Sequence, residues 1–182
     1  TNNLGYQVIT RINTLHPPFD NLAVRRAALL ALDQRDVLAA MFSDTSLYRT
    51  CAAMFVCDTP LATDAGGTTL IDGSGRDEAR ELLTASGYDG APVVILQPTD
   101  VEVMRSQPQV VAQALREVGF TVELQSLDWQ TLIQRRGNRG TIDEGGWNIF
   151  FTFGAGVEVL NPITNIMAHA PGPETAWFGW PD

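Results

Sequence analysis

The sequence contains no lysine, and its 12 basic residues are all arginines, set against 21 aspartates and glutamates. The formal net charge is therefore −9. A surface that binds nucleic acid or an anionic membrane needs clustered cations. The densest cluster here is Arg135, Arg136 and Arg139, which follow a predicted helix and are typical of a solvated face. We therefore expect neither nucleic acid nor a membrane surface as a partner.

Long apolar runs are also missing. No stretch reaches about 18 consecutive apolar residues, the length that a membrane-spanning helix requires. The chain is nevertheless 45% hydrophobic over 182 residues, which is enough to bury one sizeable core. We therefore expect a single globular domain covering residues 1–182.

Motifs for catalysis are lacking as well. The sequence has no G-x-S-x-G elbow, no P-loop, no G-x-G-x-x-G fingerprint and no H-E-x-x-H helix. No group of metal-ligating residues shows a usual ligand spacing. We therefore expect no catalytic residues, no metal site and no cofactor.

Cysteine is scarce, with Cys51 and Cys57 as the only pair and five residues between them. Redox motifs usually have a gap of two residues, and the two histidines lie far from this pair in sequence. The favoured interpretation is a local disulfide that closes a small loop, which implies an oxidising compartment. The alternative is two free buried thiols in a cytosolic protein. Residues 43–75, which contain both cysteines, show neither helical nor strand periodicity and predict a long irregular segment.

Apolar periodicity predicts the regular elements. Alternating apolar and polar side chains predict strands over 5–13 and 120–127, and two strongly apolar runs predict strands over 92–97 and 147–153. Helical spacing predicts helices over 22–32, from Asp33 onward, over 76–86, over 101–118 and from Asp128 onward. Pro108 requires the fourth of these helices to begin close to it. From residue 92 to 153 the order is βαβαβ, which predicts an α/β fold with parallel strands and helices on the faces of the sheet.

An open α/β sheet binds ligands beyond the carboxyl ends of its strands. In this sequence those ends carry the candidate ligand-binding residues Gln97, Thr99, Asp100, Phe153 and Gly154. Phe151 and Phe153 share one face of a strand, so we expect one of them to reach the surface at the end of that strand.

The stretch Pro17-Pro18-Phe19-Asp20-Asn21, followed by an arginine-bearing helix, resembles a signature of family 5 extracellular solute-binding proteins. This is the dipeptide, oligopeptide and nickel-carrier class. Three further pieces occur in the expected order: Ala79–Leu83 with Gly87-Tyr88, Leu115 with Val118–Phe120, and Gly146–Ile149 leading to Asn161-Pro162. The resemblance implies a periplasmic-binding-protein-like lobe and covers nearly all of the chain. It also implies that the first motif is scaffold and not part of a pocket.

This resemblance implies the substrate-binding component of an ABC import system. Such a receptor captures a peptide or another small solute between two lobes and delivers it to the membrane permease. The chain is then most of the second, C-terminal lobe of a monomeric periplasmic or extracellular protein, lipid-anchored in some forms, and the first lobe is its missing partner. It implies no enzymatic activity. The alternatives are a ligand-sensing regulatory domain and a small α/β enzyme.

The resemblance also bears on the ligand. Dipeptide carriers of the family place an aspartate four residues before the proline after the last strand, where it meets a ligand ammonium group, and Glu158 stands at the matching position. Dipeptide carriers place an arginine at the loop that corresponds to 97–100, and this loop contains none. A cationic, amine-bearing or sugar-like solute is therefore implied as readily as a dipeptide.

Overall fold

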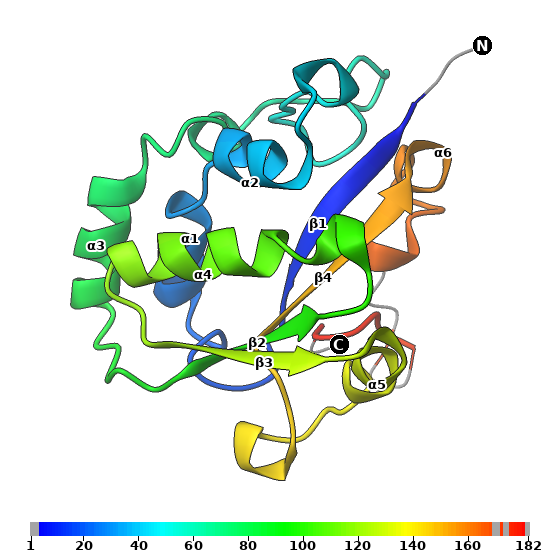
Figure 1. Cartoon of the computed structure of the whole chain (residues 1–182). Coiled ribbons are helices and arrows are strands. Elements are labelled where there is room, and N and C mark those ends of the chain that lie inside the picture. The colour runs from blue at the N-terminus through cyan, green and yellow to red at the C-terminus, as the bar shows by residue number, and fades with distance from the viewer. Residues whose placement is uncertain (1–3, 169–171, 173–174, 181–182) are drawn as a thin grey trace.

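A four-stranded sheet lies at the centre of the computed structural model, which describes residues 4–168, 172 and 175–180 (Figure 1). The strands are β1 (Tyr6–Ile12), β2 (Val93–Pro98), β3 (Val122–Leu127) and β4 (Ile149–Ala155). Their order across the sheet is β1-β4-β2-β3. β2 is parallel to both β3 and β4, whereas β1 is antiparallel to β4. The predicted α/β fold with its parallel βαβαβ portion is therefore confirmed.

The helices follow the predicted order along the chain. They are α1 (Leu22–Leu30), α2 (Gln34–Met41), α3 (Arg76–Ala85), α4 (Gln107–Glu117), α5 (Trp129–Arg135) and the short α6 (Gly156–Val159). Pro108 lies in the first turn of α4, where its missing N–H interrupts no helical hydrogen bond. Residues 102–104 form a separate 3-10 turn, so α4 begins later than residue 101, as the proline requires.

The sheet consists of two ribbons that diverge. β1 pairs with β4 over seven residues of each strand, and β2 pairs with β3 over six. Within the described part of the chain, β2 and β4 share a single ladder pair, Ile95 and Ile149. Beyond that pair β4 turns away from β2 (Figure 1). The carboxyl ends of β2 and β4 therefore reach different parts of the same edge of the sheet.

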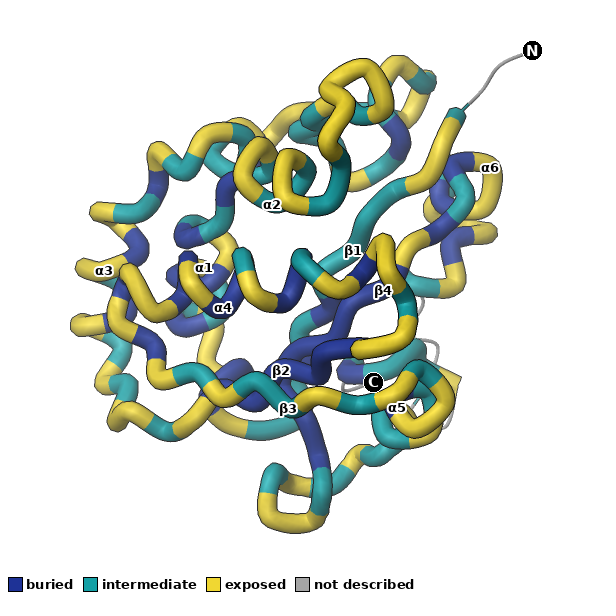
Figure 2. Tube along the Cα trace, viewed as in Figure 1, coloured by how far each residue is buried: buried dark blue, intermediate teal, exposed yellow. Residues whose placement is uncertain are grey.

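Each face of the sheet has its own buried core, and the side chains of β2 alternate between them. Val93 and Ile95 pack with residues of α1, α3 and α4, whereas Val94 and Leu96 pack with α5 and with aromatic residues. All four are fully buried, as the continuous apolar run predicted. Figure 2 shows the buried middle of the sheet between these two layers.

The diproline motif shapes the entry to α1. Phe19 is fully buried, and the Asn21 side chain caps the helix by accepting a hydrogen bond from the Ala23 N–H at 2.9 Å. The Arg25 guanidinium donates back to the carbonyl oxygens of Phe19 and Asp20 at 2.6 and 2.9 Å. The motif therefore serves here as scaffold.

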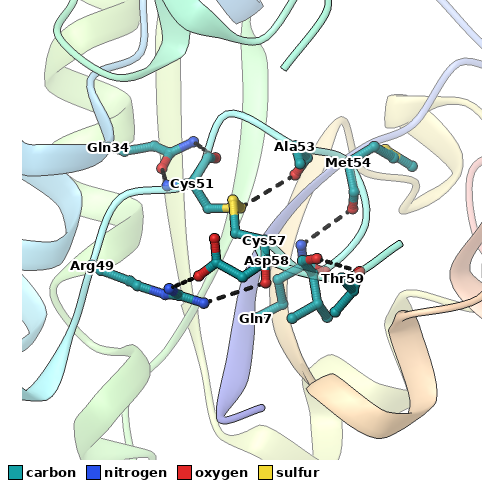
Figure 3. Close-up of a disulfide and its surroundings, with 10 residues drawn as sticks. Gln7, Gln34, Arg49, Cys51, Ala53, Met54, Cys57, Asp58 and Thr59 are labelled. Carbon is teal, nitrogen blue, oxygen red and sulfur yellow. Dashed lines mark hydrogen bonds and ion pairs between the residues drawn. A yellow bond between two sulfur atoms is a disulfide. The ribbon is translucent and has the colours of Figure 1, made fainter. Parts of the chain in front are cut away.

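A disulfide joins Cys51 and Cys57, with Cα atoms 5.9 Å apart, inside the long segment between α2 and α3 (Figure 3). In the described residues this segment contains only the 3-10 turns Thr45–Leu47 and Thr68–Leu70 as regular structure. The side-chain amide of Gln34 holds the start of the loop through two 2.8 Å hydrogen bonds to the Cys51 backbone. The predicted disulfide is confirmed.

Arg11 of β1 ties the C-terminal part of the chain to the second face of the sheet. Its guanidinium carbon lies 4.9 Å from the ring centroid of Trp177 and 4.3 Å from that of Trp180. Its Nε donates to the Phe178 carbonyl oxygen at 2.6 Å. Burial lowers the pKa of Arg11 to about 10. The side chain therefore stays charged at neutral pH between two aromatic rings.

Candidate functional site

The loop after β2 carries three of the predicted site residues. Gln97 is buried, whereas Thr99 and Asp100 are exposed. The Thr99 hydroxyl donates to the Leu127 carbonyl oxygen at 3.1 Å, and the Asp100 carboxylate accepts from the Trp129 N–H at 2.8 Å. These contacts fasten the loop to the end of β3 and to the first residue of α5.

An arginine lies against this loop, although the loop itself contains none. Arg105 donates through its guanidinium to the Thr99 carbonyl oxygen at 3.1 Å and forms an ion pair with Glu102, also at 3.1 Å. Its own carbonyl oxygen accepts a 3.3 Å hydrogen bond from the Gln97 amide. The loop contains no arginine, as the sequence shows, but the 3-10 turn Glu102–Met104 folds the chain back and places Arg105 at the strand end.

The end of β4 presents an uncovered aromatic pair. Phe153 is 44% exposed, and its ring packs edge-to-face on Tyr6 with centroids 5.6 Å apart. Tyr6 is itself 73% exposed. Phe151, two residues earlier on the same face, is fully buried. The prediction that one of the two phenylalanines reaches the surface is therefore confirmed.

A tight turn follows the aromatic pair. Gly154 is buried, and a Cβ atom there would lie only 2.7 Å from Cγ1 of Val159, so a larger side chain would require Val159 to move. Glu158 is exposed, and its Oε2 accepts from the Ala155 N–H at 3.3 Å. That hydrogen bond holds the carboxylate at the point where β4 ends and α6 begins.

The predicted site residues thus form two groups, one after β2 and one after β4. Among the described residues, no hydrogen bond or ion pair joins the two groups. Three acids, Asp100, Asp128 and Glu158, stand at these strand ends, and hydrogen bonds from Thr131 lower the pKa of Asp128 below its usual value. The positive charge of Arg105 is balanced by its ion pair with Glu102. The three acids therefore make this edge of the sheet suitable for a ligand that carries a positive group.

Two residues near the strand ends were not identified from the sequence. Tyr6 is one of them, because its partner on β4 is distant in sequence and antiparallel pairing was not predicted. Gln107 is the other: it is 1% exposed, and its Nε2 donates to the Thr10 hydroxyl at 3.3 Å. Gln107 falls inside the helix predicted over 101–118, but no local pattern indicated that its side chain would be buried against Thr10 of β1.

A groove of about 410 Å³ lies elsewhere, between α2 and α4. Arg76 forms ion pairs beside it with Asp36 at 3.0 Å and Glu117 at 3.7 Å. Among the described residues, no three histidine, cysteine or acidic side chains gather as a metal site. None of the helices in the described part of the chain is both long and apolar enough to cross a membrane.

The chain was compared with known protein families and with individual proteins. Residues 2–168 match the family model of bacterial extracellular solute-binding proteins, family 5 Middle. A probable peptide ABC transporter periplasmic-binding protein of Sinorhizobium fredii is 35% identical over 180 residues, which is 99% of this chain and 34% of that protein.

Solved structures show the same fold. The ABC transporter substrate-binding protein CtaP of Listeria monocytogenes superposes with a TM-score of 0.74 at 17% identity, over 96% of this chain and 36% of the other. OppA of Haemophilus influenzae, in complex with RPPGFSPFR, gives a TM-score of 0.61 at 19% identity, over 82% of this chain and 29% of the other. The chain thus spans about a third of the length of these proteins.

Proposed function

Because the chain belongs to the bacterial extracellular solute-binding proteins, family 5, we propose that it is a lobe of the substrate-binding component of an ABC import system. The full-length protein captures a small solute and delivers it to a permease in the membrane. The family is one of binding proteins, and this chain binds its solute without converting it. The Sinorhizobium relative is a probable peptide ABC transporter periplasmic-binding protein, which supports this assignment.

The end of β4 is the observation that carries the proposal. Phe153, Tyr6 and Glu158 all stay exposed there, at the edge of the sheet where open α/β folds bind their ligands. Single exposed apolar residues are ordinary, but an exposed aromatic pair beside a fixed carboxylate marks a surface that something else covers. A ligand held against a second lobe supplies that cover.

The chain forms most of the second lobe of a two-lobed clamp, and the missing first lobe closes over the strand ends. Support comes from the share of the Sinorhizobium relative that this chain covers, 34%. We assign direct ligand contacts to Thr99, Asp100, Phe153 and Glu158. The two buried candidates, Gln97 and Gly154, shape the backbone beneath them.

The ligand is most simply a peptide. The carboxylate of Glu158 suits an ammonium group, because charge-assisted hydrogen bonds are strong and directional. Arg105 is close enough to the first loop to meet a ligand carboxylate once its ion pair with Glu102 is exchanged. A peptide can use Glu158 through its ammonium group and, after that exchange, Arg105 through its carboxylate, whereas a purely cationic solute uses the acids alone.

The proposed location is periplasmic or extracellular, and the full-length protein is a monomer. The Cys51–Cys57 disulfide supports an oxidising compartment. A regulatory ligand-sensing domain in the cytosol would instead keep both thiols free. Thiol counting on denatured, unreduced protein should give none for the proposed receptor, and two thiols would favour the regulatory domain.

Native mass spectrometry of the full-length protein from its host tests the function. We expect a non-covalent small-molecule adduct that is lost on denaturation, and a Glu158→Gln variant with much lower occupancy. Glu123→Gln, an exposed acid on β3, is the matched control and should keep the adduct. Equal occupancy in both variants would remove Glu158 from the site. Chemical conversion of the released solute by purified protein would contradict a role confined to binding.

A further inference from the structure

A second pocket, of about 360 Å³, lies at the end of α5. Its walls are residues 136–139, which follow the helix, and Ala176, Phe178 and Gly179 of the C-terminal segment. The indole Nε1 of Trp147, two residues before β4 begins, donates to the Arg136 carbonyl oxygen at 3.1 Å. The pocket therefore lies near the amino end of β4, whereas Phe153 and Glu158 lie at its carboxyl end. Its volume is in the range of small-molecule sites.

The arginines of this region differ in what their guanidinium groups contact. Arg11 donates to three backbone carbonyl oxygens. Arg135 donates to the carbonyl oxygens of Gly145 and Gly146 at 3.0 and 3.1 Å. The Arg136 guanidinium makes no hydrogen bond or ion pair with any described residue, and its Nε is buried without a partner. Buried donors without an acceptor cost free energy, so Arg136 is the arginine here that an added acceptor would stabilise.

Two aromatic rings hold the Arg136 guanidinium in place. Its central carbon lies 4.6 Å from the ring centroid of Phe178 and 5.7 Å from that of Phe150. A ring attracts the positive charge, but it lacks the paired oxygen acceptors that match a guanidinium. Burial lowers the pKa of Arg136 below its usual value, because the charged form is partly removed from water. An anion beside Arg136 would restore the interactions that burial removes.

The other walls of the pocket define the kind of anion. Arg139 adds a second positive charge, and none of the described residues that line the pocket is acidic. Ala176 and Phe178 supply apolar surface. A positive group beside apolar walls suits an anion with a small apolar body better than a bare inorganic ion. The two oxygens of a carboxylate match the planar donors of a guanidinium.

We propose that this pocket binds a small organic carboxylate, with Arg136 as its charged partner. The carboxylate joins the end of α5 to segment 175–180, at the point where Arg136 and Phe178 already meet. The site goes beyond the proposed function, because it lies at the other end of β4 and shares no residue with the candidate solute site.

Hydrogen–deuterium exchange on the full-length protein tests this site, with butyrate as the probe. Butyramide has the same size and the same apolar body but no charge, so it is the matched control ligand. At about ten times its dissociation constant, butyrate should slow local amide exchange in residues 136–139 and 176–179 about tenfold, because opening requires its release. Butyramide should slow that exchange by less than about twofold.

Three variants locate the carboxylate. Arg136→Gln removes the charge and should abolish the protection by butyrate. Arg26→Gln removes the same charge at an exposed position on α1 and should keep the protection. Arg136→Lys keeps the charge but loses the planar fork, so it should bind butyrate roughly tenfold more weakly. Wild-type exchange rates in the buried strand β2 verify that each variant is folded.

Equal protection by butyramide would overturn the assignment of a carboxylate, and protection that persists in Arg136→Gln would overturn the role of Arg136. No protection in the wild type would overturn the site and indicate that an acid of the full-length protein already fills the pocket. The solute adduct in native mass spectrometry should persist in Arg136→Gln. Its loss would contradict a separate site, while the Glu158→Gln comparison would still decide the proposed function.

Discussion

The aromatic side chains of β4 lie in two different environments. Phe150 is fully buried on the second face of the sheet, where its ring lies 4.9 Å from Trp147, 5.6 Å from Trp177 and 6.2 Å from Phe178. Phe153, three residues later on the opposite face, packs on the ring of Tyr6, its one aromatic neighbour among the described residues, and remains 44% exposed. The same strand thus carries a closed aromatic cluster at its middle and an open aromatic pair at its end.

The two regions also differ in how charge is used. In the closed cluster two arginines lie over the rings: Arg11 over Trp177 and Trp180, and Arg136 4.6 Å from the Phe178 centroid. At the open end the charge is the Glu158 carboxylate, which is exposed and bound to a backbone N–H. Rings that the chain covers itself serve stability, whereas the rings beside the exposed carboxylate stay uncovered in the described part of the chain.

The largest expected effect comes from comparing the two phenylalanines directly. Phe150→Ala should lower the free energy of unfolding by about 3–5 kcal/mol, because it leaves a cavity in the closed cluster. Phe153→Ala should change it by less than about 1 kcal/mol, since this ring is already partly in water. Urea unfolding of both variants measures the difference. Similar losses for both would show that the open pair is structural.

Removal of the disulfide should have the second-largest effect on the free energy of unfolding. The Cys51→Ser/Cys57→Ser double variant should lose about 2–3 kcal/mol, because the short loop gains freedom chiefly in the unfolded chain. Reductant should lower the free energy of unfolding of the wild type, measured in urea, by the same amount. It should not change the free energy of unfolding of the double variant. A reductant effect in the variant would point to a cause other than this bond.

Arg11→Lys tests the planar guanidinium group inside the closed cluster. Lysine keeps the charge but loses the planar stacking between Trp177 and Trp180 and the hydrogen bond to Phe178. We expect a loss of about 1–2 kcal/mol in the free energy of unfolding. Arg26→Lys, at an exposed position on α1, is the control and should be neutral. Equal effects of the two substitutions would contradict a structural role for the buried guanidinium.

The smallest effect concerns pH. Burial alone would raise the pKa of Asp33, but hydrogen bonds and charge from Arg35 outweigh it and lower that pKa below its usual value. A lowered pKa in the folded state contributes stability above about pH 4 that is lost as pH falls through the folded value. Asp33→Asn should therefore cost about 1 kcal/mol at pH 7, because it removes the ion pair with Arg35, and less at pH 3. A constant difference across this range in acid-to-neutral unfolding curves would contradict the assignment.

Local patterns in the sequence were sufficient for much of the fold. The alternation over 5–13, the apolar run at 92–97 and the helical spacing around Val111 and Leu115 each predicted an element that the structure contains. Pro108 located the start of α4, and the spacing of Cys51 and Cys57 predicted their bond. These features depend on residues that are close to one another in the sequence, so local sequence patterns are sufficient to predict them.

Contacts between distant segments were not predictable in this way. The hydrogen bond from Arg11 to Phe178 spans 167 residues, and no local pattern marks either partner for the other. The pairing of Tyr6 with Phe153 depends on the antiparallel register of β1 on β4. Arg105 returns to the loop after β2 through a 3-10 turn that has no periodic signature. The candidate positions at the strand ends followed from topology, but their division into two groups followed only from the divergence of β2 and β4.

Hydrogen–deuterium exchange on the full-length protein, with and without its co-purified solute, tests the central claim most directly. The solute should slow amide exchange in residues 97–100 and 153–158, at the strand ends, and leave the closed cluster around residues 177–180 unchanged. Slower exchange confined to the closed cluster, or none at the two strand ends, would contradict a binding site built on the carboxyl ends of β2 and β4.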